Sequence, residues 1–277
     1  MALIQVSFMS KTLLRTVPLQ VILPVDKFTM NDSDSREEKP FKTLYLLHGL
    51  FGNQVDWVSG TRIQRWAEEK NLAVVMPAGE NAFYIDQPEM GTMHGKFIGE
   101  ELVDITRRMF PLSKKREDTY IGGLSMGGFG ALRNGLKYHD TFGAIISLSG
   151  ALHILENPEE IQAGSIAYEE AYFGDLKEAA KSDKNPAVLI EQLKEAKEKD
   201  PSTAVPEIFM ACGTEDGLLT ANRVYHERLE NSGMHVSYHE SAGAHTWDFW
   251  DEWIKKALDW LPLEEKTEGL NSGNVNV

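Results

Sequence analysis

The chain has 277 residues, 42% of them hydrophobic and 25% charged, which is enough for one large α/β domain with a sizeable buried core. A formal net charge of −14, with Lys114-Lys-Arg116 as the only basic cluster, argues against a nucleic-acid partner, because a phosphate-binding surface needs clustered Lys and Arg. The single cysteine, Cys212, excludes an intramolecular disulfide and a thiolate zinc site.

The first elements expected along the chain are the two strands of a hairpin, at residues 2–9 and 13–23. No basic segment precedes the short apolar stretch at the N-terminus, and no apolar run approaches the roughly 18 residues of a membrane span. The polar loop at 31–39 lacks the glycine and the final glutamate of a calcium-binding loop. We therefore expect a cytoplasmic protein without a membrane partner, and a solvated turn at 31–39.

Strands and helices alternate over most of the remaining chain. Apolar runs predict strands at 43–47, 72–77, 144–149, 207–212 and 235–240 and one that leads into Ser125, and helical periodicity predicts helices at 62–70, 97–110, 126–138, 221–231 and 247–260. This alternation predicts a mostly parallel central sheet with helices on both faces, and a functional site at the carboxyl ends of the strands.

Residues 151–205 interrupt the alternation, because this stretch is rich in Glu, Lys and Ala and shows helical patterns but no strand. We expect it to be a cap insertion within a single domain at 1–263, which a polar tail at 264–277 follows. A cap at the carboxyl ends of the strands would cover the site. The ligands that fit there are then expected to depend on apolar side chains of the insertion, such as Ile154, Leu155 and Phe173.

The stretch Gly122-Gly-Leu-Ser-Met-Gly-Gly contains the pattern G-x-S-x-G, and its serine, Ser125, stands where a strand turns into a helix. Glycine at 123 and 127 permits a sharp turn, because a side chain at either position would collide with the neighbouring strand or helix. The turn holds the Ser125 hydroxyl above the sheet, where the Met126 N–H and the helix dipole favour a developing negative charge. We predict that Ser125 is a nucleophile.

A serine hydroxyl needs a base to take its proton, and the base needs a carboxylate to hold it. Among the eight histidines, His245 is favoured because it lies in the loop between the last strand and the last helix, at the same edge of the sheet as Ser125. Asp216 is the first choice of acid because it directly follows the strand at 207–212. Two alternatives stay open at this point, Glu215 and Asp248. The order Ser125, Asp216, His245 is the order of an α/β-hydrolase triad.

The transition state also needs two hydrogen-bond donors for its oxyanion. Met126 N–H supplies one, and the loop His48-Gly49-Leu50, which follows an early strand, is expected to supply Leu50 N–H as the other. We expect His48 to brace this loop rather than to transfer protons. Aromatic residues near predicted strand ends or beside His245 are candidates to line the substrate pocket: Phe51, Phe83, Tyr84 and Trp247.

Further motifs accompany these residues: Leu46-Leu-His-Gly49, Gly52-Asn-x-x-x-Trp57, Phe83-Tyr-x-Asp86, Glu100-Glu-Leu102, Phe110-Pro111, Cys212-Gly-Thr-Glu-Asp216 and His245-x-Trp247. Together with the serine motif they resemble the α/β-hydrolase carboxylesterases that are grouped as esterase D-like or tributyrin esterase-like, over most of the chain. The resemblance implies the α/β-hydrolase fold and a serine esterase for short acyl esters that uses no cofactor and no metal. Relatives in this group cleave acetyl or feruloyl groups from plant polysaccharide, and others hydrolyse S-formylglutathione.

The resemblance does not choose among these substrates. Phe51 and Gly52 follow His48-Gly-Leu50, so this loop lacks the cysteine that is frequent in the formylglutathione enzymes. A thioester substrate is therefore somewhat less favoured than an ester. An acyltransferase on the same scaffold and a non-catalytic binding module stay open as alternatives. The expected partner is a small ester molecule, and a homo-oligomer is compatible with the sequence.

Overall fold

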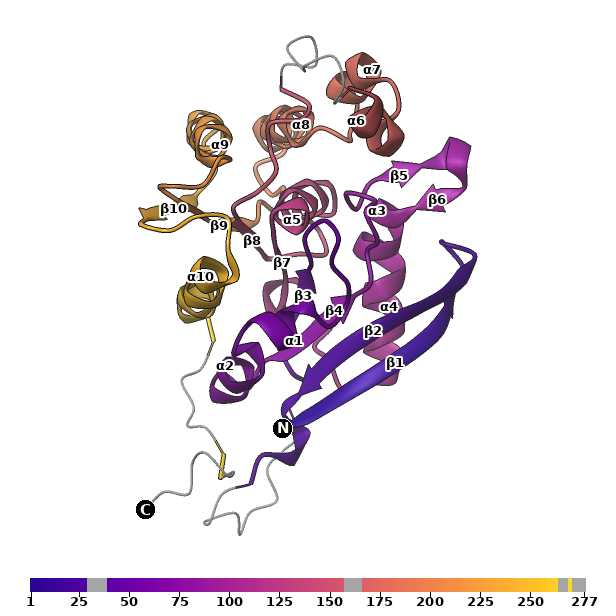
Figure 1. Cartoon of the computed structure of the whole chain (residues 1–277), viewed down its shortest axis with the longest axis vertical. Coiled ribbons are helices and arrows are strands. Elements are labelled where there is room, and N and C mark those ends of the chain that lie inside the picture. The colour runs from indigo at the N-terminus through magenta and orange to yellow at the C-terminus, as the bar shows by residue number, and fades with distance from the viewer. Residues whose placement is uncertain (29–38, 157–165, 264–268, 271–277) are drawn as a thin grey trace.

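The computed structural model describes residues 1–28, 39–156, 166–263 and 269–270. Within these residues an eight-stranded sheet runs in the order β1-β2-β4-β3-β7-β8-β9-β10 (Figure 1). Its strands are β1 Ala2–Ser10, β2 Arg15–Leu23, β3 Thr43–Leu47, β4 Ala73–Pro77, β7 Thr119–Leu124, β8 Ala144–Leu148, β9 Glu207–Gly213 and β10 Val236–Ser241. A separate short ribbon pairs β5 Asp86–Gln87 with β6 Thr92–Met93.

The sheet is mostly parallel, as the alternation of elements predicts. β2 pairs antiparallel with β1 and with β4, and every pair from β4 to β10 is parallel. The central strands β3, β4, β7 and β8 are buried along their whole length, which explains their unbroken apolar sequences. All the parallel strands end at one edge of the sheet, and the serine turn follows the end of β7 there.

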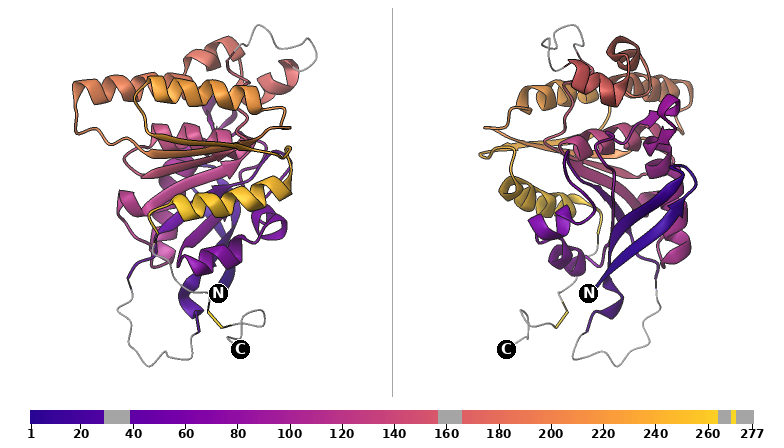
Figure 2. Two further views of the ribbon diagram at one scale, coloured as in Figure 1. Left: turned by 90° about the vertical axis from the view of Figure 1, so that its left-hand side faces the viewer. Right: turned by 45° about the vertical axis from the view of Figure 1, so that its right-hand side comes forward.

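Helices cover both faces of the sheet (Figure 2). One face carries α1 Asp56–Gly60, α2 Ile63–Glu69 and α10 Trp247–Trp260. The opposite face carries α4 Leu102–Met109, α5 Met126–Lys137, α8 Pro186–Lys199 and α9 Leu219–Asn231, and the shorter helices are α3 His94–Lys96, α6 Ile166–Phe173 and α7 Leu176–Lys181. Two buried apolar clusters fill the spaces between the sheet and its helical layers, so the sheet is the middle of three layers.

The helix expected at 97–110 is interrupted. A π-helical segment at Phe97–Glu101 joins α3 to α4. Gly99 in this segment lies against the ring of Tyr138, which a Cβ at position 99 would approach to 2.2 Å. Glu101 at its end accepts hydrogen bonds from the Ser10 hydroxyl at 2.6 Å and from the Lys11 N–H at 2.7 Å. Both contacts come from distant parts of the chain, so the periodicity of 97–110 alone could not indicate the wider turn.

The expected cap at 151–205 belongs in part to the helical layer. Among the described residues of this stretch, three helices and no strand are present. The longest of them, α8, packs on α5 and also contacts α9 (Figure 1). It buries Leu189, Ile190 and Leu193 in the same apolar cluster as α5. A cap over the site and a domain limit at 263 stay predictions. The solvated turn at 31–39 and the loose tail at 264–277 fall mostly outside the described residues.

Three residues of this stretch that were expected to select ligands are core residues instead. Ile154 and Leu155 are 5% and 2% exposed, and Phe173 is fully buried. The Phe173 ring packs at 4.8 Å from Phe83 and at 5.7 Å from Phe129, measured between centroids. The expectation was wrong because an apolar residue in an insertion can equally well complete the main core, and sequence alone does not separate these two roles.

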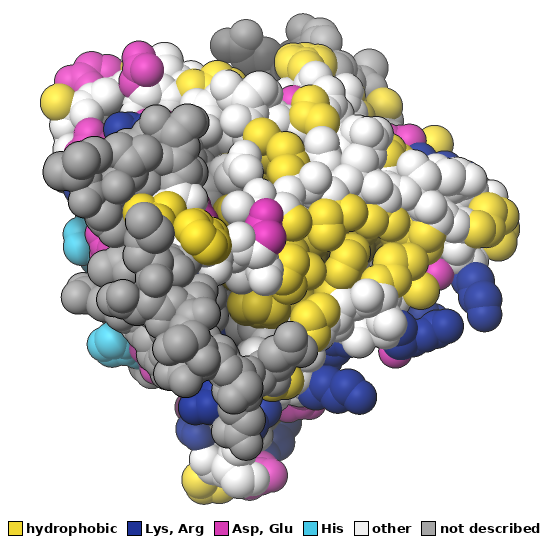
Figure 3. Space-filling view, turned by 90° about the horizontal axis from the view of Figure 1, so that it is seen from below, with side chains coloured by type: hydrophobic (Ala, Val, Ile, Leu, Met, Phe, Trp, Pro, Cys, Tyr) yellow, Lys and Arg dark blue, Asp and Glu magenta, His cyan; other side chains and the backbone are white. Residues whose placement is uncertain are grey.

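Hydrophobic side chains also gather on part of the surface (Figure 3). Leu3 and Met9 on the edge strand β1 are 42% and 63% exposed, and Val25 and Phe28 beyond β2 are also exposed. β1 alternates exposed and half-buried residues because only one of its faces packs on the protein. The homo-oligomer that the sequence allows stays a prediction.

Removing the Phe173 ring should destabilise the fold without changing substrate preference. Because the ring is fully buried among other aromatic rings, we expect Phe173→Ala to lower the free energy of unfolding by about 3–5 kcal/mol. Urea denaturation measures this change. The matched control is Phe28→Ala, which removes a 59% exposed ring and should cost less than about 0.5 kcal/mol. Equal losses in the two variants would contradict the core assignment.

Candidate active site

Ser125 occupies the turn between β7 and α5 in a strained backbone conformation. Its φ and ψ are 54° and −118°, a positive φ that residues other than glycine rarely adopt. Two contacts hold the turn: the Ser125 N–H donates to the Leu148 carbonyl at 2.9 Å, and the Ser125 carbonyl accepts from the Ala151 N–H at 3.0 Å. The serine is therefore bonded to the chain at the end of the neighbouring strand β8.

The glycines of the serine motif are required by close backbone packing. A Cβ at Gly123 would lie 2.4 Å from the Gly127 carbonyl oxygen, and one at Gly127 would lie 2.3 Å from the Leu47 carbonyl oxygen. Backbone atoms cannot move aside as a flexible side chain can. The structure thus shows the collisions that the sequence predicts at both positions.

His245 and Asp216 are joined directly. His245 Nδ1 donates to Asp216 Oδ2 at 2.9 Å, and the Leu218 N–H donates to Asp216 Oδ1 at the same distance. Burial raises the pKa of the Asp216 carboxyl, but hydrogen bonds from His245, the Leu218 N–H and the Ser149 hydroxyl outweigh it, so the net pKa lies below its ordinary value. A buried, ionised Asp216 can hold the His245 ring with its other nitrogen, Nε2, free to accept a proton.

The two alternative acids make other contacts. Glu215 is exposed and accepts hydrogen bonds from the Gly243 N–H and from the Thr214 hydroxyl. It therefore braces the loop before His245 rather than the ring itself. Asp248 is exposed on α10, and the described residues show no bond from its carboxylate to His245.

Two further side chains that the sequence did not single out support this pair. Ser149, at the end of β8, has a φ of 47°, and its hydroxyl bonds to Asp216 while it accepts from the Trp250 indole N–H at 3.2 Å. The Trp250 ring stands edge-on to the His245 imidazole at 4.8 Å between centroids. Trp250 is a buried residue of α10 that also contacts the histidine ring. Nothing in the local sequence pattern marks either role.

His48 braces the loop that follows β3, as predicted. Its Nε2 accepts from the Gly79 N–H at 2.8 Å, so Nδ1 carries the proton and donates to the Gly49 carbonyl at 2.7 Å. The His48 carbonyl accepts from the Tyr84 hydroxyl at 2.9 Å. Burial lowers the pKa of His48, against the opposing effects of the Gly49 carbonyl and the Asp56 charge. A neutral His48 with this tautomer is what the loop requires.

The same loop contains one backbone N–H without an acceptor among the described residues. The Phe51 N–H donates to Asn81 Oδ1 at 2.8 Å, and the Gly52 N–H donates to the Gly49 carbonyl at 3.3 Å. Of the amides at 50, 51 and 52, all within the described residues, only that of Leu50 has no such acceptor. The Met126 N–H is the first of helix α5 and has no partner inside the helix. Both amides remain available to an oxyanion.

A cavity of about 610 Å³ opens beside these groups. It is lined by residues from the loop after β3, from the serine turn and from the start of α10: Gly49, Leu50, Phe51, Gly52, Asp56, Leu124, Ser125, His245, Thr246, Trp247 and Trp250. Ser125 and His245 thus face the same space, although the described residues show no hydrogen bond between their side chains. Catalytic hydrogen bonds are often long without substrate and shorten when it binds.

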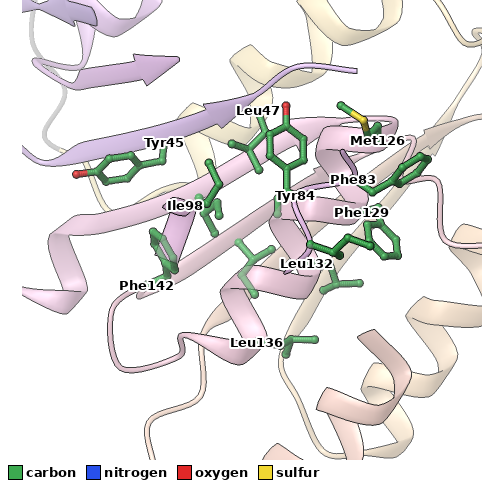
Figure 4. Packing of buried hydrophobic residues seen from close by; sticks show 14 of the residues in the cluster. Tyr45, Leu47, Phe83, Tyr84, Ile98, Met126, Phe129, Leu132, Leu136 and Phe142 are labelled. Carbon is green, nitrogen blue, oxygen red and sulfur yellow. The ribbon is translucent and has the colours of Figure 1, made fainter. Parts of the chain in front are cut away.

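Two of the four aromatic candidates line this cavity and two do not. Phe51 and Trp247 do, and Phe51 is 82% exposed. Phe83 is buried against Phe129 at 5.7 Å between ring centroids, and Tyr84 is fully buried with its hydroxyl on the His48 carbonyl (Figure 4). The prediction was wrong for Phe83 and Tyr84 because their rings pack in the apolar core on the α5 side of the sheet.

The described part of the chain contains no group of three or more His, Cys, Asp or Glu side chains that could hold a metal ion. It also contains no helix that is both long and apolar enough to cross a membrane. The cytoplasmic location stays a prediction.

Comparisons with known proteins show similarity to esterases over most of the chain. A family model described as putative esterase matches residues 10–261. An acetyl esterase from Caldicellulosiruptor saccharolyticus is 43% identical over 266 residues, which are 94% of this chain and 98% of that protein.

Two solved structures from Staphylococcus aureus each match 94% of this chain and 98% of their own. The substrate-bound fluorophosphonate-binding serine hydrolase FphF is 30% identical with a TM-score of 0.80, and the S-formylglutathione hydrolase FrmB, an apoenzyme, is 31% identical with a TM-score of 0.79. The predicted α/β-hydrolase fold is therefore confirmed.

The lowered pKa of His48 predicts a loss of stability in acid. The pKa of His48 is lower in the folded protein than in the unfolded chain, where it is about 6.5. The neutral, hydrogen-bonded His48 therefore stabilises the fold above about pH 6.5, and this stabilisation is lost as the pH falls towards the folded pKa. We expect the Tm of the wild type to fall between about pH 7 and pH 5, and to fall less in His48→Gln. The control is His235→Gln, an exposed histidine, which should follow the wild type. An equal fall in all three proteins would contradict a neutral, bonded His48.

Proposed function

This chain belongs to the esterase family and is a carboxylic ester hydrolase, and from that premise we propose that it hydrolyses short-chain acyl esters through Ser125, His245 and Asp216. The observation that carries the proposal is the 2.9 Å bond from His245 to the buried Asp216, with His245 and Ser125 on one cavity. An oriented base beside a serine at a helix N-terminus is what acyl transfer needs.

In the proposed mechanism His245 moves protons and Ser125 carries the acyl group. His245 Nε2 takes the proton of Ser125 as Oγ attacks the ester carbonyl carbon, and the carbonyl oxygen becomes an oxyanion. The same Nε2–H then gives its proton to the leaving alcohol oxygen as the C–O bond breaks, which leaves an acyl-enzyme. Water, deprotonated by His245, attacks this acyl-enzyme in the reverse sequence and releases the acid. Asp216 keeps the ring oriented and stabilises its cationic form.

The proposed oxyanion donors are the backbone N–H groups of Leu50 and Met126. Neither amide has an acceptor among the residues that the structure describes. The two segments that carry them meet at Gly49, where a Cβ would lie 3.6 Å from Ser125 Cβ. Because these donors are held by the backbone, they do not have to reorganise when charge develops. The Asn81 and His48 contacts fix the loop that carries Leu50.

The 43% identical acetyl esterase supports a short acyl group, and the cavity of about 610 Å³ is large enough for a small ester. A second candidate is a thioester hydrolase that acts on S-formylglutathione, which the likeness to FrmB supports. Rates on p-nitrophenyl esters of increasing chain length, beside S-formylglutathione and a feruloyl ester, separate these substrates. Product analysis with an added alcohol distinguishes hydrolysis from acyl transfer.

The proposed triad predicts unequal effects of two neighbouring acids. Ser125→Ala should lower kcat on short-chain esters by at least about 10⁴-fold, because the nucleophile acts as a unit with its base. Asp216→Asn should also be severe, whereas Glu215→Gln, which alters only a loop contact, should matter little. Steady-state kinetics of the three variants, with Tm as the control for folding, measure this. If Glu215→Gln proves the more damaging, the acid has been misassigned by one residue.

The proposed oxyanion donor predicts a difference between two substitutions at one position. Leu50→Pro deletes the N–H and should reduce kcat by roughly 10²- to 10³-fold, since one such hydrogen bond is worth about 3 kcal/mol. Leu50→Ala keeps the N–H and should cost far less. Both variants must keep the wild-type Tm for the comparison to hold. Equal losses in folded variants would show that the Leu50 side chain matters rather than its amide.

A further inference from the structure

One charged group on the cavity has no part in the proposed chemistry. The Asp56 side chain lines the cavity together with Ser125 and His245, and it is half-buried. Among the described residues no hydrogen bond and no ion pair reaches its carboxylate oxygens, whereas those of Asp216, behind His245, accept several. A carboxylate without a partner at a binding cavity is available to a ligand.

Contacts along one loop place Asp56 close to the reacting serine. A Cβ added at Gly52 would lie only 2.0 Å from Asp56 Oδ2. The Gly52 N–H donates to the Gly49 carbonyl at 3.3 Å. Gly49 in turn lies beside Ser125. The Asp56 carboxylate is therefore separated from Ser125 by one turn of this loop. It occupies the space that a side chain at position 52 would need.

The helix that carries Asp56 lies on the histidine side of the cavity. α1 packs directly on Trp247, because a Cβ at Gly60 would lie 2.5 Å from the Trp247 ring, and the Trp57 ring meets it edge-on at 5.7 Å between centroids. Trp247 is only two residues beyond His245, which gives its proton to the leaving alcohol. Asp56 thus lines the cavity at the start of the helix that packs on Trp247, beside the segment that carries His245.

We propose that Asp56 selects the leaving alcohol by accepting a hydrogen bond from a free hydroxyl next to the ester oxygen and by repelling negative charge. This inference rests on the proposed function of Ser125 and His245. An ionised carboxylate is an acceptor only, so the group that it binds must be a donor. The remaining side chains at this end, Phe51, Trp247 and Trp250, offer apolar surface to the carbon skeleton of the alcohol. The preferred substrates are monoesters of neutral diols and polyols.

Three acetates on one ring test the inference, since they share the acyl group and differ in one neighbouring substituent. They are cyclohexyl acetate, the monoacetate of trans-cyclohexane diol with adjacent oxygens, and the acetate of the corresponding hydroxy-carboxylate. We expect the wild type to favour the diol monoacetate over cyclohexyl acetate by about tenfold or more in kcat/KM, as for a hydrogen bond to a charged group. It should disfavour the anionic acetate by a similar factor.

Variants at Asp56 should change these two ratios separately. Asp56→Ala should abolish both the preference for the hydroxyl and the discrimination against the anion. Asp56→Asn has the same shape and an acceptor oxygen but no charge, so it should keep a few-fold preference for the hydroxyl and lose the discrimination against the anion. Asp248→Asn removes a charge three residues from His245 that does not line the cavity, and it should change neither ratio.

Four results would overturn the inference. Unchanged ratios in Asp56→Ala, or a uniform loss on all three acetates, would show that Asp56 does not select the alcohol. A change of ratios in Asp248→Asn equal to that in Asp56→Asn would show an effect of net charge alone. A wild type that hydrolyses none of the acetates would instead overturn the proposed function, and the inference with it.

Discussion

The close packing of backbone around the serine turn constrains the rest of the site. β3, β7 and α5 approach so closely that neither Gly123 nor Gly127 has room for a Cβ, and Ser125 between them adopts a positive φ. Such a conformation costs about 1–3 kcal/mol and persists only where the surroundings determine it. Here two features hold the conformation: the buried strands β3 and β8 on either side of β7, and the hydrogen bond from the Ser125 N–H to the Leu148 carbonyl. Ser125, the proposed nucleophile, is held by the middle of the sheet.

The loops at the ends of the strands hold one another in pairs. The loop after β3 depends on the loop after β4, through His48 and Gly79 and through Phe51 and Asn81. The loops after β8, β9 and β10 meet in the network of Ser149, Asp216 and His245, which Trp250 of α10 completes. Polar groups in these loops are bonded to each other, so a single geometry is favoured. The amide of Leu50 and the carboxylate of Asp56 are exceptions, and both border the cavity.

Much of this arrangement follows from local sequence, because buried parallel strands need continuous apolar runs and a strand–helix turn needs small residues. These rules locate β3, β4, β7 and β8 and the serine turn directly. They cannot tell which face of a loop an aromatic residue uses, and so Phe83 and Tyr84 were misplaced while Phe51 was not. Asn81 and Ser149 belong to no pattern, since each acts through one contact with a residue far away in sequence. The roles of such residues depend on tertiary packing alone.

The central claim is that Ser125 alone becomes covalently modified during turnover. Mass-spectrometric mapping of the wild type after reaction with a serine-directed alkylphosphonate tests it most directly, because the phosphonyl group stays on the nucleophile. The account predicts one label per chain, on the peptide that contains Ser125, with esterase activity lost in proportion to labelling. A stoichiometric label on another residue, or complete labelling with activity retained, would contradict it.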